Sequence, residues 1–291
     1  RHPLLNVSVN PFMASLYMQK MCLENNITLL YNHQVAGVIK EGETVNGVVT
    51  LSKNGLEAVL ADVFVDCTGD GDLCAFAGAA YELGAQDGEL QPGTLTFCMT
   101  GYDLGMMDAT QVEEAYQTAV RNGELFHNDY WPRGNFIELF RGNTNNANHV
   151  DYNSHNKSAI SNAEIKAKES VERVINWIRK NLPGAENVEI TACSPSVSMR
   201  EWRRVKCLTQ VTCEDYVAGK KYEDSVCYSY YPIDLHTVNE LPVLNIFMGE
   251  DVVPSIPYSA MVVKGFSNLL VAGRCIDSDR LANSALRVKS S

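Results

Sequence analysis

The sequence lacks several patterns that mark whole classes of protein. No run of apolar residues approaches the ~20 that a membrane-spanning helix needs, so we expect no membrane segment. Lys and Arg number 24 against 35 Asp and Glu, a net charge of −11, whereas nucleic-acid binding needs clustered cations. The nine cysteines form no Cys-x-x-Cys pair, which argues against a zinc site or a disulfide framework. These absences favour a cytoplasmic protein whose partner is a small molecule.

A complete Gly-x-Gly-x-x-Gly phosphate loop is also missing. The nearest match is Gly69-Asp-Gly71-Asp-Leu-Cys74, in which cysteine replaces the third glycine. Asp70 and Asp72 would place negative charge where a pyrophosphate should lie, so we interpret this turn as following a later strand. With 291 residues, 45% of them apolar and 20% charged, the chain is long enough for one large or two ordinary globular domains.

Two apolar segments that end abruptly in glycine stand out among the patterns present. Residues 63–70 read Val-Phe-Val-Asp-Cys-Thr-Gly-Asp, and residues 268–274 read Asn-Leu-Leu-Val-Ala-Gly-Arg. Buried parallel strands have this composition, and glycine at their carboxyl ends lets the backbone approach a ligand closely. We therefore expect the two segments to lie side by side and to present Gly69 and Gly273 to one cofactor.

These segments and their surroundings resemble the FAD-dependent oxidoreductases of the glutathione-reductase-like superfamily, in particular a bacterial family to which xanthan lyase activity is sometimes ascribed. The resemblance rests on the order and spacing of five strings: Asp66-Cys-Thr-Gly-Asp70, Met199-Arg-Glu-Trp-Arg-Arg204, Tyr231-Pro-Ile-Asp-Leu-His236, Ile256-Pro-Tyr258 and Gly273-Arg274. Members open with a Gly-x-Gly-x-x-Gly unit and close with a helix directed at the flavin. Because this chain shows neither, we interpret it as an internal fragment that binds little FAD and is inactive by itself.

The resemblance implies roles for several residues. The cofactor-binding candidates are Val35 near the adenine, Cys67, Thr68 and Gly69 after the first segment, and Gly273 and Arg274 after the second. Arg287 corresponds to the arginine before the flavin-facing helix, where a cation stabilises reduced flavin, unless the missing helix leaves it disordered. The implied reaction is hydride transfer between an unidentified organic substrate and FAD.

Local patterns predict an α/β fold, with an inserted α+β part. The resemblance implies that residues 1–90 form a partial FAD-binding domain of the two-dinucleotide-binding-domain type, 91–255 a substrate domain, and 256–291 a return to the first domain. The elements expected are a helix from Pro11 to Glu24 capped by Asn10, strands at 27–31, 34–40, 44–52, 56–60 and 94–100, a helix capped by Asp108, and a long helix opened by Ser161-x-x-Glu164 and stopped by Pro183-Gly184.

Two arginines are candidates for binding an anionic substrate or cofactor group. Arg200 and Arg204 are four residues apart, which on a helix would place them on one face, although an extended arrangement is equally compatible with the flanking sequence. A guanidinium matches a carboxylate or phosphate in shape. The alternative is an ordinary ion pair with Glu201, Glu214 or Asp215.

His236 is the candidate for proton exchange with the substrate. In an extended segment Asp234 and His236 point to the same side, and a carboxylate beside an imidazole orients the ring and raises its basicity, which favours a proton donor. A structural histidine is the alternative. Cys67 and Cys275 beside the two segments are further candidates for a redox thiol, although buried apolar packing is the more ordinary role of cysteine.

Two other functions stay open at this point. The Asn-rich stretch from 143 to 156, with His149, Asp151 and His155, is typical of a solvated loop but allows a metal or sugar site. Aromatic residues are also candidates for stacking on sugars in a non-catalytic structural or carbohydrate-interacting domain, namely Tyr130, Trp131, Tyr228, Tyr230 and Tyr231. Polysaccharide-lyase chemistry would need a Tyr or His base, and no spacing singles one out.

Overall fold

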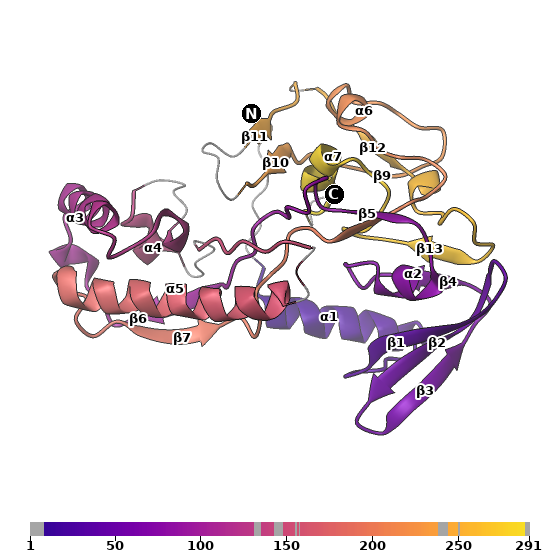
Figure 1. Ribbon diagram of the computed structural model, residues 1–291, viewed down its shortest axis with the longest axis horizontal. Coiled ribbons are helices and arrows are strands. Elements are labelled where there is room, and N and C mark those ends of the chain that lie inside the picture. Colours follow the sequence, from indigo (N-terminus) through magenta and orange to yellow (C-terminus); the bar gives the residue numbers. More distant parts are fainter. Residues whose placement is uncertain are drawn as a thin grey trace. The chain divides into compact units, whose positions relative to one another are not determined.

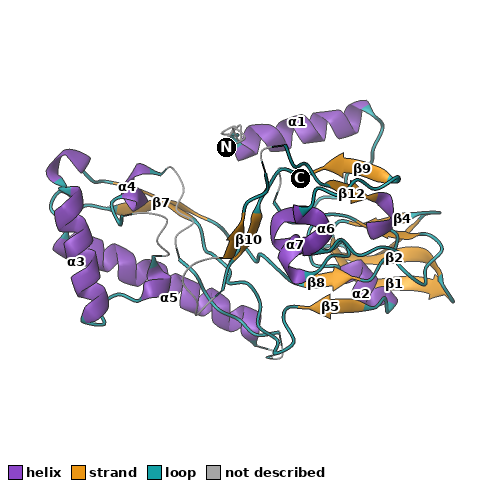
Figure 2. Ribbon diagram, turned by 90° about the horizontal axis from the view of Figure 1, so that it is seen from above, coloured by secondary structure: helices purple, strands orange, loops and turns teal. Residues whose placement is uncertain are grey.

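The computed structural model describes residues 9–130, 135–142, 148–154, 156, 158–237, 244–249 and 251–288. The fold is mixed α/β, with small sheets of two or three strands in the described residues (Figures 1 and 2). The chain forms two compact units. Unit 1 comprises Arg1–Tyr81, Arg204–Tyr230 and Phe247–Ser278, and unit 2 comprises Glu82–Arg203, Tyr231–Ile246 and Asp279–Ser291. These limits lie at other residues than the predicted domain boundaries.

Unit 1 contains most of the strands. Its elements are α1 (Pro11–Glu24), β1 (Gln34–Glu41), β2 (Thr44–Ser52), β3 (Gly55–Leu60), β4 (Phe64–Asp66), α2 (Asp72–Ala77), α6 (Cys213–Val217), β9 (Ser225–Tyr228), β12 (Ser255–Pro257), the 3₁₀ turn η3 (Tyr258–Ala260) and β13 (Leu269–Val271). β5 (Tyr81–Leu83) and β8 (Arg203–Val205) each contain a point where the chain passes from one unit to the other.

The antiparallel meander of unit 1 follows the predicted pattern closely. β2 pairs with β1 on one side and β3 on the other, and Ser52 pairs with Gly55 across the predicted turn (Figure 1). The strand predicted at 27–31 is wrong. Asn26 and Asn32 adopt left-handed backbone with φ of 57° and 59°, a conformation that ends extended structure at both sides of these five residues.

Helix α1 begins and ends where its sequence predicts. The Asn10 side-chain oxygen accepts hydrogen bonds from the backbone N–H groups of Phe12 and Met13, and Pro11 occupies the first helical position. None of its residues is buried, and apolar side chains such as those of Phe12 and Met18 are exposed. The Asn10 cap and Pro11, both local features, account for where this helix begins.

Unit 2 contains the longest helix and a separate core. Its elements are β6 (Phe97–Thr100), η1 (Leu104–Met106), α3 (Ala109–Arg121), η2 (His127–Asp129), α4 (Glu138–Arg141), α5 (Ala159–Asn181), β7 (Glu189–Cys193), β10 (Ile233–Leu235), β11 (Leu244–Ile246) and α7 (Arg280–Leu286). Figure 1 shows α5 lying along the antiparallel pair β6 and β7. The aromatic centre of this core is Phe136, which is fully buried and stacks on Tyr116 with ring centroids 4.7 Å apart.

One of the two predicted helix starts in unit 2 differs from the structure. Asp108 caps α3 as predicted, accepting from the N–H groups of Thr110 and Gln111. α5, however, begins at Ala159, so Ser161 lies inside its first turn and is no cap. The Glu164 carboxylate accepts instead from the backbone N–H of Val197 at 2.7 Å. A long-range acceptor role thus takes the place of the predicted local capping box.

Candidate functional site

The two glycine-terminated segments meet in unit 1, as predicted. β4 and β13 are parallel neighbours, with Phe64 opposite Leu269 and Asp66 opposite Val271. The pairing continues one residue further, because the backbone N–H of Ala272 donates to the Asp66 carbonyl at 2.9 Å. The turns after both strands therefore start from the same edge, which is where α/β folds bind cofactors.

Both turn glycines adopt backbone that disfavours other residues. Gly69 has φ of +82° and Gly273 has φ of +88°. A Cβ at Gly69 would lie 2.7 Å from Nη2 of Arg274, so a larger residue there would displace the arginine. A Cβ at Gly273 would meet no protein atom within 4 Å. The backbone at Gly273 therefore borders open space. Because glycine has no side chain, a ligand in that space can approach the backbone closely.

Arg274 joins the two turns. Its Nε donates to the Gly69 carbonyl at 3.2 Å, and its Nη2 lies 2.7 Å from the Asp70 carboxylate. The guanidinium is partly exposed, at 29%. Because Asp70 is its partner in this structure, a phosphate that binds Arg274 must compete with that carboxylate.

Asp66 holds the first turn in place, a role that our sequence analysis missed. The buried carboxylate accepts from the backbone N–H and the hydroxyl of Thr68, at 3.0 and 2.7 Å, and from the backbone N–H of Cys74 at 2.9 Å. Thr68 Oγ1 accepts in turn from the N–H of Asp72. An aspartate at the last position of an apolar strand is the signal that identifies such a residue.

The thiols beside the strands are not activated. Partial desolvation, with a smaller contribution from the Asp66 carboxylate, raises the pKa of Cys67, although this residue is exposed at the surface. Burial also raises the pKa of Cys275 to about 12. The protonated thiol is a poor nucleophile, so this geometry argues against a redox thiol at either position. No disulfide involves any of the nine cysteines, all of which lie in the described ranges.

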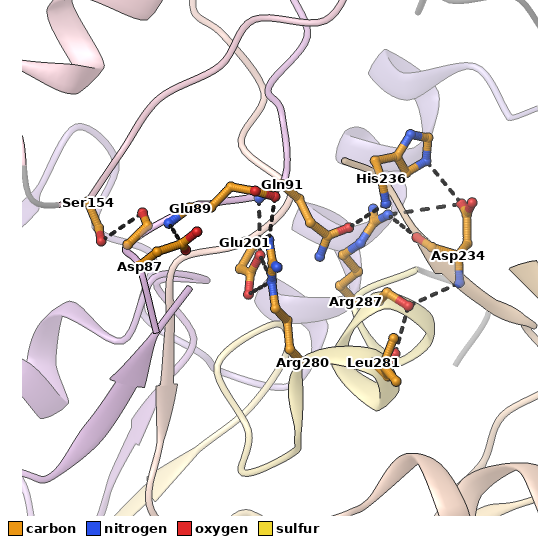
Figure 3. Close-up of polar contacts among 12 residues, drawn as sticks. Asp87, Glu89, Gln91, Ser154, Glu201, Asp234, His236, Arg280, Leu281 and Arg287 are labelled. Atoms are coloured by element: carbon orange, nitrogen blue, oxygen red, sulfur yellow. Dashed lines mark hydrogen bonds and ion pairs between the residues drawn. The ribbon is translucent and has the colours of Figure 1, made fainter. Parts of the chain in front are cut away.

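A second cluster of polar residues lies in unit 2, at β10 and α7 (Figure 3). His236 Nε2 lies 3.3 Å from the Asp234 carboxylate, which confirms that the two side chains point to the same side. The Asp234 backbone is held at both ends, because its N–H donates to Ser284 Oγ at 3.0 Å and its carbonyl accepts from Arg287 at 3.2 Å. Arg287 therefore has a defined place at the end of α7, with 11% of its side chain exposed.

The pKa of His236 is lowered, opposite to the direction that the neighbouring carboxylate suggested. Burial of the ring, which is 2% exposed, is the largest cause, and the cations Arg200 and Arg287 act in the same direction. The Asp234 carboxylate opposes them without prevailing. The imidazole is thus neutral near neutral pH, which suits a proton acceptor better than the predicted proton donor.

This lowered pKa makes stability depend on pH. Below the unfolded-state value of about 6.5, an unfolded chain binds a proton that folded His236 does not, so acidification destabilises the fold. We expect His236→Asn to remove this part of the loss, by about 1.4 kcal/mol for each tenfold difference in proton affinity between the two states. Denaturant unfolding at a series of pH values measures it. The exposed His127→Gln serves as control, and equal pH slopes in all three proteins would contradict the assignment.

Arg200 and Arg204 do not share a helix face. The chain is extended around them, so the helical alternative is wrong, and Arg204 belongs to unit 1 while Arg200 belongs to unit 2. Arg200 donates to the Pro92 carbonyl and, from Nη2, to His149 Nε2 at 3.3 Å. Of the carboxylates named as alternative partners, Glu201 pairs with Arg280 and Asp215 with Lys220, and an ion pair of either arginine stays a prediction.

A chain of hydrogen bonds runs from the backbone of His236 through Gln91 and Glu201 to Arg280 (Figure 3). Our sequence analysis did not predict it. The backbone N–H of His236 donates to Gln91 Oε1 at 3.3 Å, and the backbone N–H of Gln91 donates to Glu201 at 3.1 Å. Glu201 accepts from Arg280 Nε with both oxygens, at 3.2 and 3.1 Å, and Arg280 also contacts Glu89. These partners are up to 191 residues apart in sequence, so no local spacing indicates them.

The structure gives little support to the metal site, the sugar site or the stacking aromatic residues considered above. Within the described residues, no group of three His, Cys, Asp or Glu side chains can hold a metal ion. In the Asn-rich stretch, Asn143, Asn145, Asn146 and His155 lie outside the described residues, as does Trp131 among the aromatics. Tyr130 is buried, and Tyr231 donates to Asp234 at 3.3 Å, whereas Tyr228 and Tyr230 are exposed. None of the helices in the described ranges is both long and apolar enough to cross a membrane.

The family model described as FAD dependent oxidoreductase matches residues 2–291. No curated protein matches the chain. Among solved structures, the p-nitrophenol 4-monooxygenase PnpA from Pseudomonas putida DLL-E4 is similar, with 13% sequence identity and a TM-score of 0.35 over 70% of this chain. The matched region is 45% of that monooxygenase, so the chain spans less than half of its length.

Proposed function

The chain belongs to the FAD-dependent oxidoreductase family, and we propose that it takes part in hydride transfer between an organic substrate and FAD. The observation that supports this proposal most directly is the parallel pair β4 and β13, with Gly69, Gly273 and Arg274 following them at one edge. A bound FAD supplies two-electron chemistry, so the protein has to position it and manage charge and protons.

The residues at this edge suit the polar part of FAD. We propose that Thr68, Gly69, Gly273 and Arg274 contact it, with Cys67 alongside and Val35 of β1 nearer the adenine. The open space at Gly273 and the partly exposed guanidinium of Arg274 are the features that fit an anionic, bulky ligand. We also propose that residues 1–291 alone bind FAD weakly and lack activity, because they contain no complete Gly-x-Gly-x-x-Gly loop.

The catalytic roles belong to side chains that carry or receive charge. We propose that His236 exchanges a proton with the substrate, that Arg200 and Arg204 favour an anionic substrate group, and that Arg287 stabilises negative charge during reduction. The ordered contacts of Asp234, His236 and Arg287 support this assignment, since each is held by hydrogen bonds and nearly buried. A small molecule in the cytoplasm is the partner that this proposal implies.

Flavin binding tests the proposal. Residues 1–291, and a protein lengthened at both ends with any adjoining coding sequence, are mixed with FAD, freed of unbound cofactor and examined for visible flavin absorbance. We expect retained flavin in the longer protein and little in the shorter one. If the longer protein stays colourless, the oxidoreductase proposal is wrong, and the non-catalytic structural or carbohydrate-interacting alternative is favoured.

Arg274 gives this test a residue-level prediction. Arg274→Ala is expected to weaken FAD binding by roughly ten- to a hundredfold, because a charged hydrogen bond contributes about 1.5–3 kcal/mol. Asp70→Asn is expected to strengthen binding, since Asp70 competes for the same guanidinium at 2.7 Å. Titrations of each protein with FAD, followed by flavin fluorescence, measure both changes in FAD affinity. The exposed Arg121→Ala is the control. Equal affinity in all four proteins would remove Arg274 from the cofactor site.

A further inference from the structure

Two buried histidines from distant parts of the sequence meet in unit 2. His149 and His236 are 3% and 2% exposed, and their ring centroids are 5.1 Å apart with planes at 83°. This edge-to-face packing brings together two groups that titrate near neutral pH. His149 has no role in the function proposed above, and its backbone is held by a hydrogen bond from its N–H to the Asn128 carbonyl at 2.8 Å.

The tautomer of His149 follows from its partner. Nε2 of His149 lies 3.3 Å from Nη2 of Arg200. A guanidinium can only donate hydrogen bonds, so Nε2 must be the acceptor and carries no hydrogen. The ring is then neutral, with its hydrogen on Nδ1.

The opposite tautomer follows for His236. Its Nε2 lies 3.3 Å from the Asp234 carboxylate, which can only accept, so Nε2 carries the hydrogen. The lone pair of the neutral ring is therefore on Nδ1. This atom is buried and has no hydrogen-bond partner in the part of the chain that the structure describes. A buried acceptor of this kind is costly unless a donor, such as a ligand O–H or N–H, reaches it.

The charges around the pair keep the lone pair available. The groups that face His236 are Asp234 on β10, Arg200 after β7, Arg287 at the end of α7 and the neutral ring of His149. Tyr231 donates to Asp234, and so reduces the charge that this carboxylate presents to the ring. Two cations and burial outweigh one carboxylate, which matches the lowered pKa of His236.

We propose that Nδ1 of His236 accepts the proton of a substrate hydroxyl or amine, and that His149, oriented by Arg200, positions the His236 ring for this transfer. In the step, the substrate O–H or N–H bond breaks, its electron pair stays on the substrate atom, and a new N–H bond forms at Nδ1. The resulting imidazolium is stabilised by Asp234 through Nε2–H. The inference rests on the proposed oxidoreductase function and narrows its substrates to alcohols and amines.

Nitrogen-15 NMR of the histidine side chains of residues 1–291 tests this directly and needs no flavin. At pH 7 we expect His236 as the neutral Nε2–H tautomer and His149 as the neutral Nδ1–H tautomer. Signals are assigned with His236→Asn and with His149→Phe, which keeps a planar ring but removes the imidazole nitrogen that Arg200 Nη2 contacts. A cationic His236 at this pH, or His236 as the Nδ1–H tautomer, would overturn the proposal.

The positioning role of His149 is tested by a separate measurement, the tautomer ratio of His236. In His149→Phe we expect the tautomer ratio of His236 to change, whereas the exposed His127→Gln should leave it unaltered. An unchanged His236 spectrum in a folded His149→Phe protein would show that His149 packs without positioning. Once a flavin-loaded protein turns over an alcohol or amine, kcat/KM should rise with pH through the pKa of His236, and His236→Asn should flatten that profile. A colourless protein with the expected tautomers would count against the oxidoreductase function and leave the orientation of the histidines standing.

Discussion

Glu201→Ala is expected to lower the free energy of unfolding by about 3–5 kcal/mol, the range found when one partner of a buried ion pair is removed. The carboxylate is almost fully buried and accepts from Arg280 and from the backbone N–H of Gln91. Removing it leaves the buried N–H of Gln91 without its acceptor and the partly buried guanidinium of Arg280 with Glu89 as its acceptor. The loss extends to His236, because Gln91 is the residue that accepts its backbone N–H.

Tryptophan fluorescence during urea unfolding measures this loss of stability in unit 2, where Glu201 lies. All three tryptophans lie between residues 82 and 203, which belong to unit 2. Glu201→Gln should lose less than Glu201→Ala, since an amide oxygen can still accept from Gln91 while the charge opposite Arg280 is gone. The exposed Glu124→Ala is the matched control, with an expected change within about 0.5 kcal/mol. A loss below about 1 kcal/mol in Glu201→Ala would show that water replaces the carboxylate.

Asp66→Ala is expected to be the second most damaging substitution, at roughly 3 kcal/mol or more. The Asp66 carboxylate accepts from three donors. The Cys74 N–H is buried, and leaving it unsatisfied costs about 1–3 kcal/mol, whereas Thr68 is exposed and each of its two lost hydrogen bonds costs about 0.5–1.5 kcal/mol. Its loss loosens the turn that carries Gly69. We therefore expect weaker FAD binding along with lower stability, because the backbone that should meet the cofactor is no longer held.

Hydrogen exchange resolves this effect locally. The amide of Cys74 and the peptide that covers residues 66–77 should exchange faster in Asp66→Ala, while residues of unit 2 keep their protection. Asp66→Asn is no neutral replacement here, since its amide group would turn a donor toward one of the three donors. Asp62→Ala, at an exposed position four residues earlier, is the control. Unchanged exchange at Cys74 in Asp66→Ala would contradict the role of this carboxylate.

Most of the predictions that the structure confirms depend on residues close in sequence, whereas the pairing of β4 with β13 joins distant segments. The Asn10 and Asp108 caps, the turn between β2 and β3 and the Asp234–His236 pair each depend on residues within about three positions of one another. The wrong predictions have two different causes. Left-handed backbone at Asn26 and Asn32 ends extended structure on both sides of residues 27–31, and the Glu164 carboxylate accepts from the distant Val197 N–H instead of closing a local cap. Local propensity holds only where no tertiary partner competes for the same group.

By itself the sequence determined the starts of α1 and α3, the antiparallel meander and the two parallel strands whose turns start from one edge. These features arise from side chains that contact their own neighbourhood, or from apolar runs that only burial can satisfy. Only the tertiary structure decided that the ring of His149 packs against that of His236 and that Gln91 links Glu201 to the His236 backbone. It also decided that the pKa of His236 is lowered. Burial and the positions of Arg200 and Arg287 set that pKa, and both result from folding distant segments together, which no local spacing encodes.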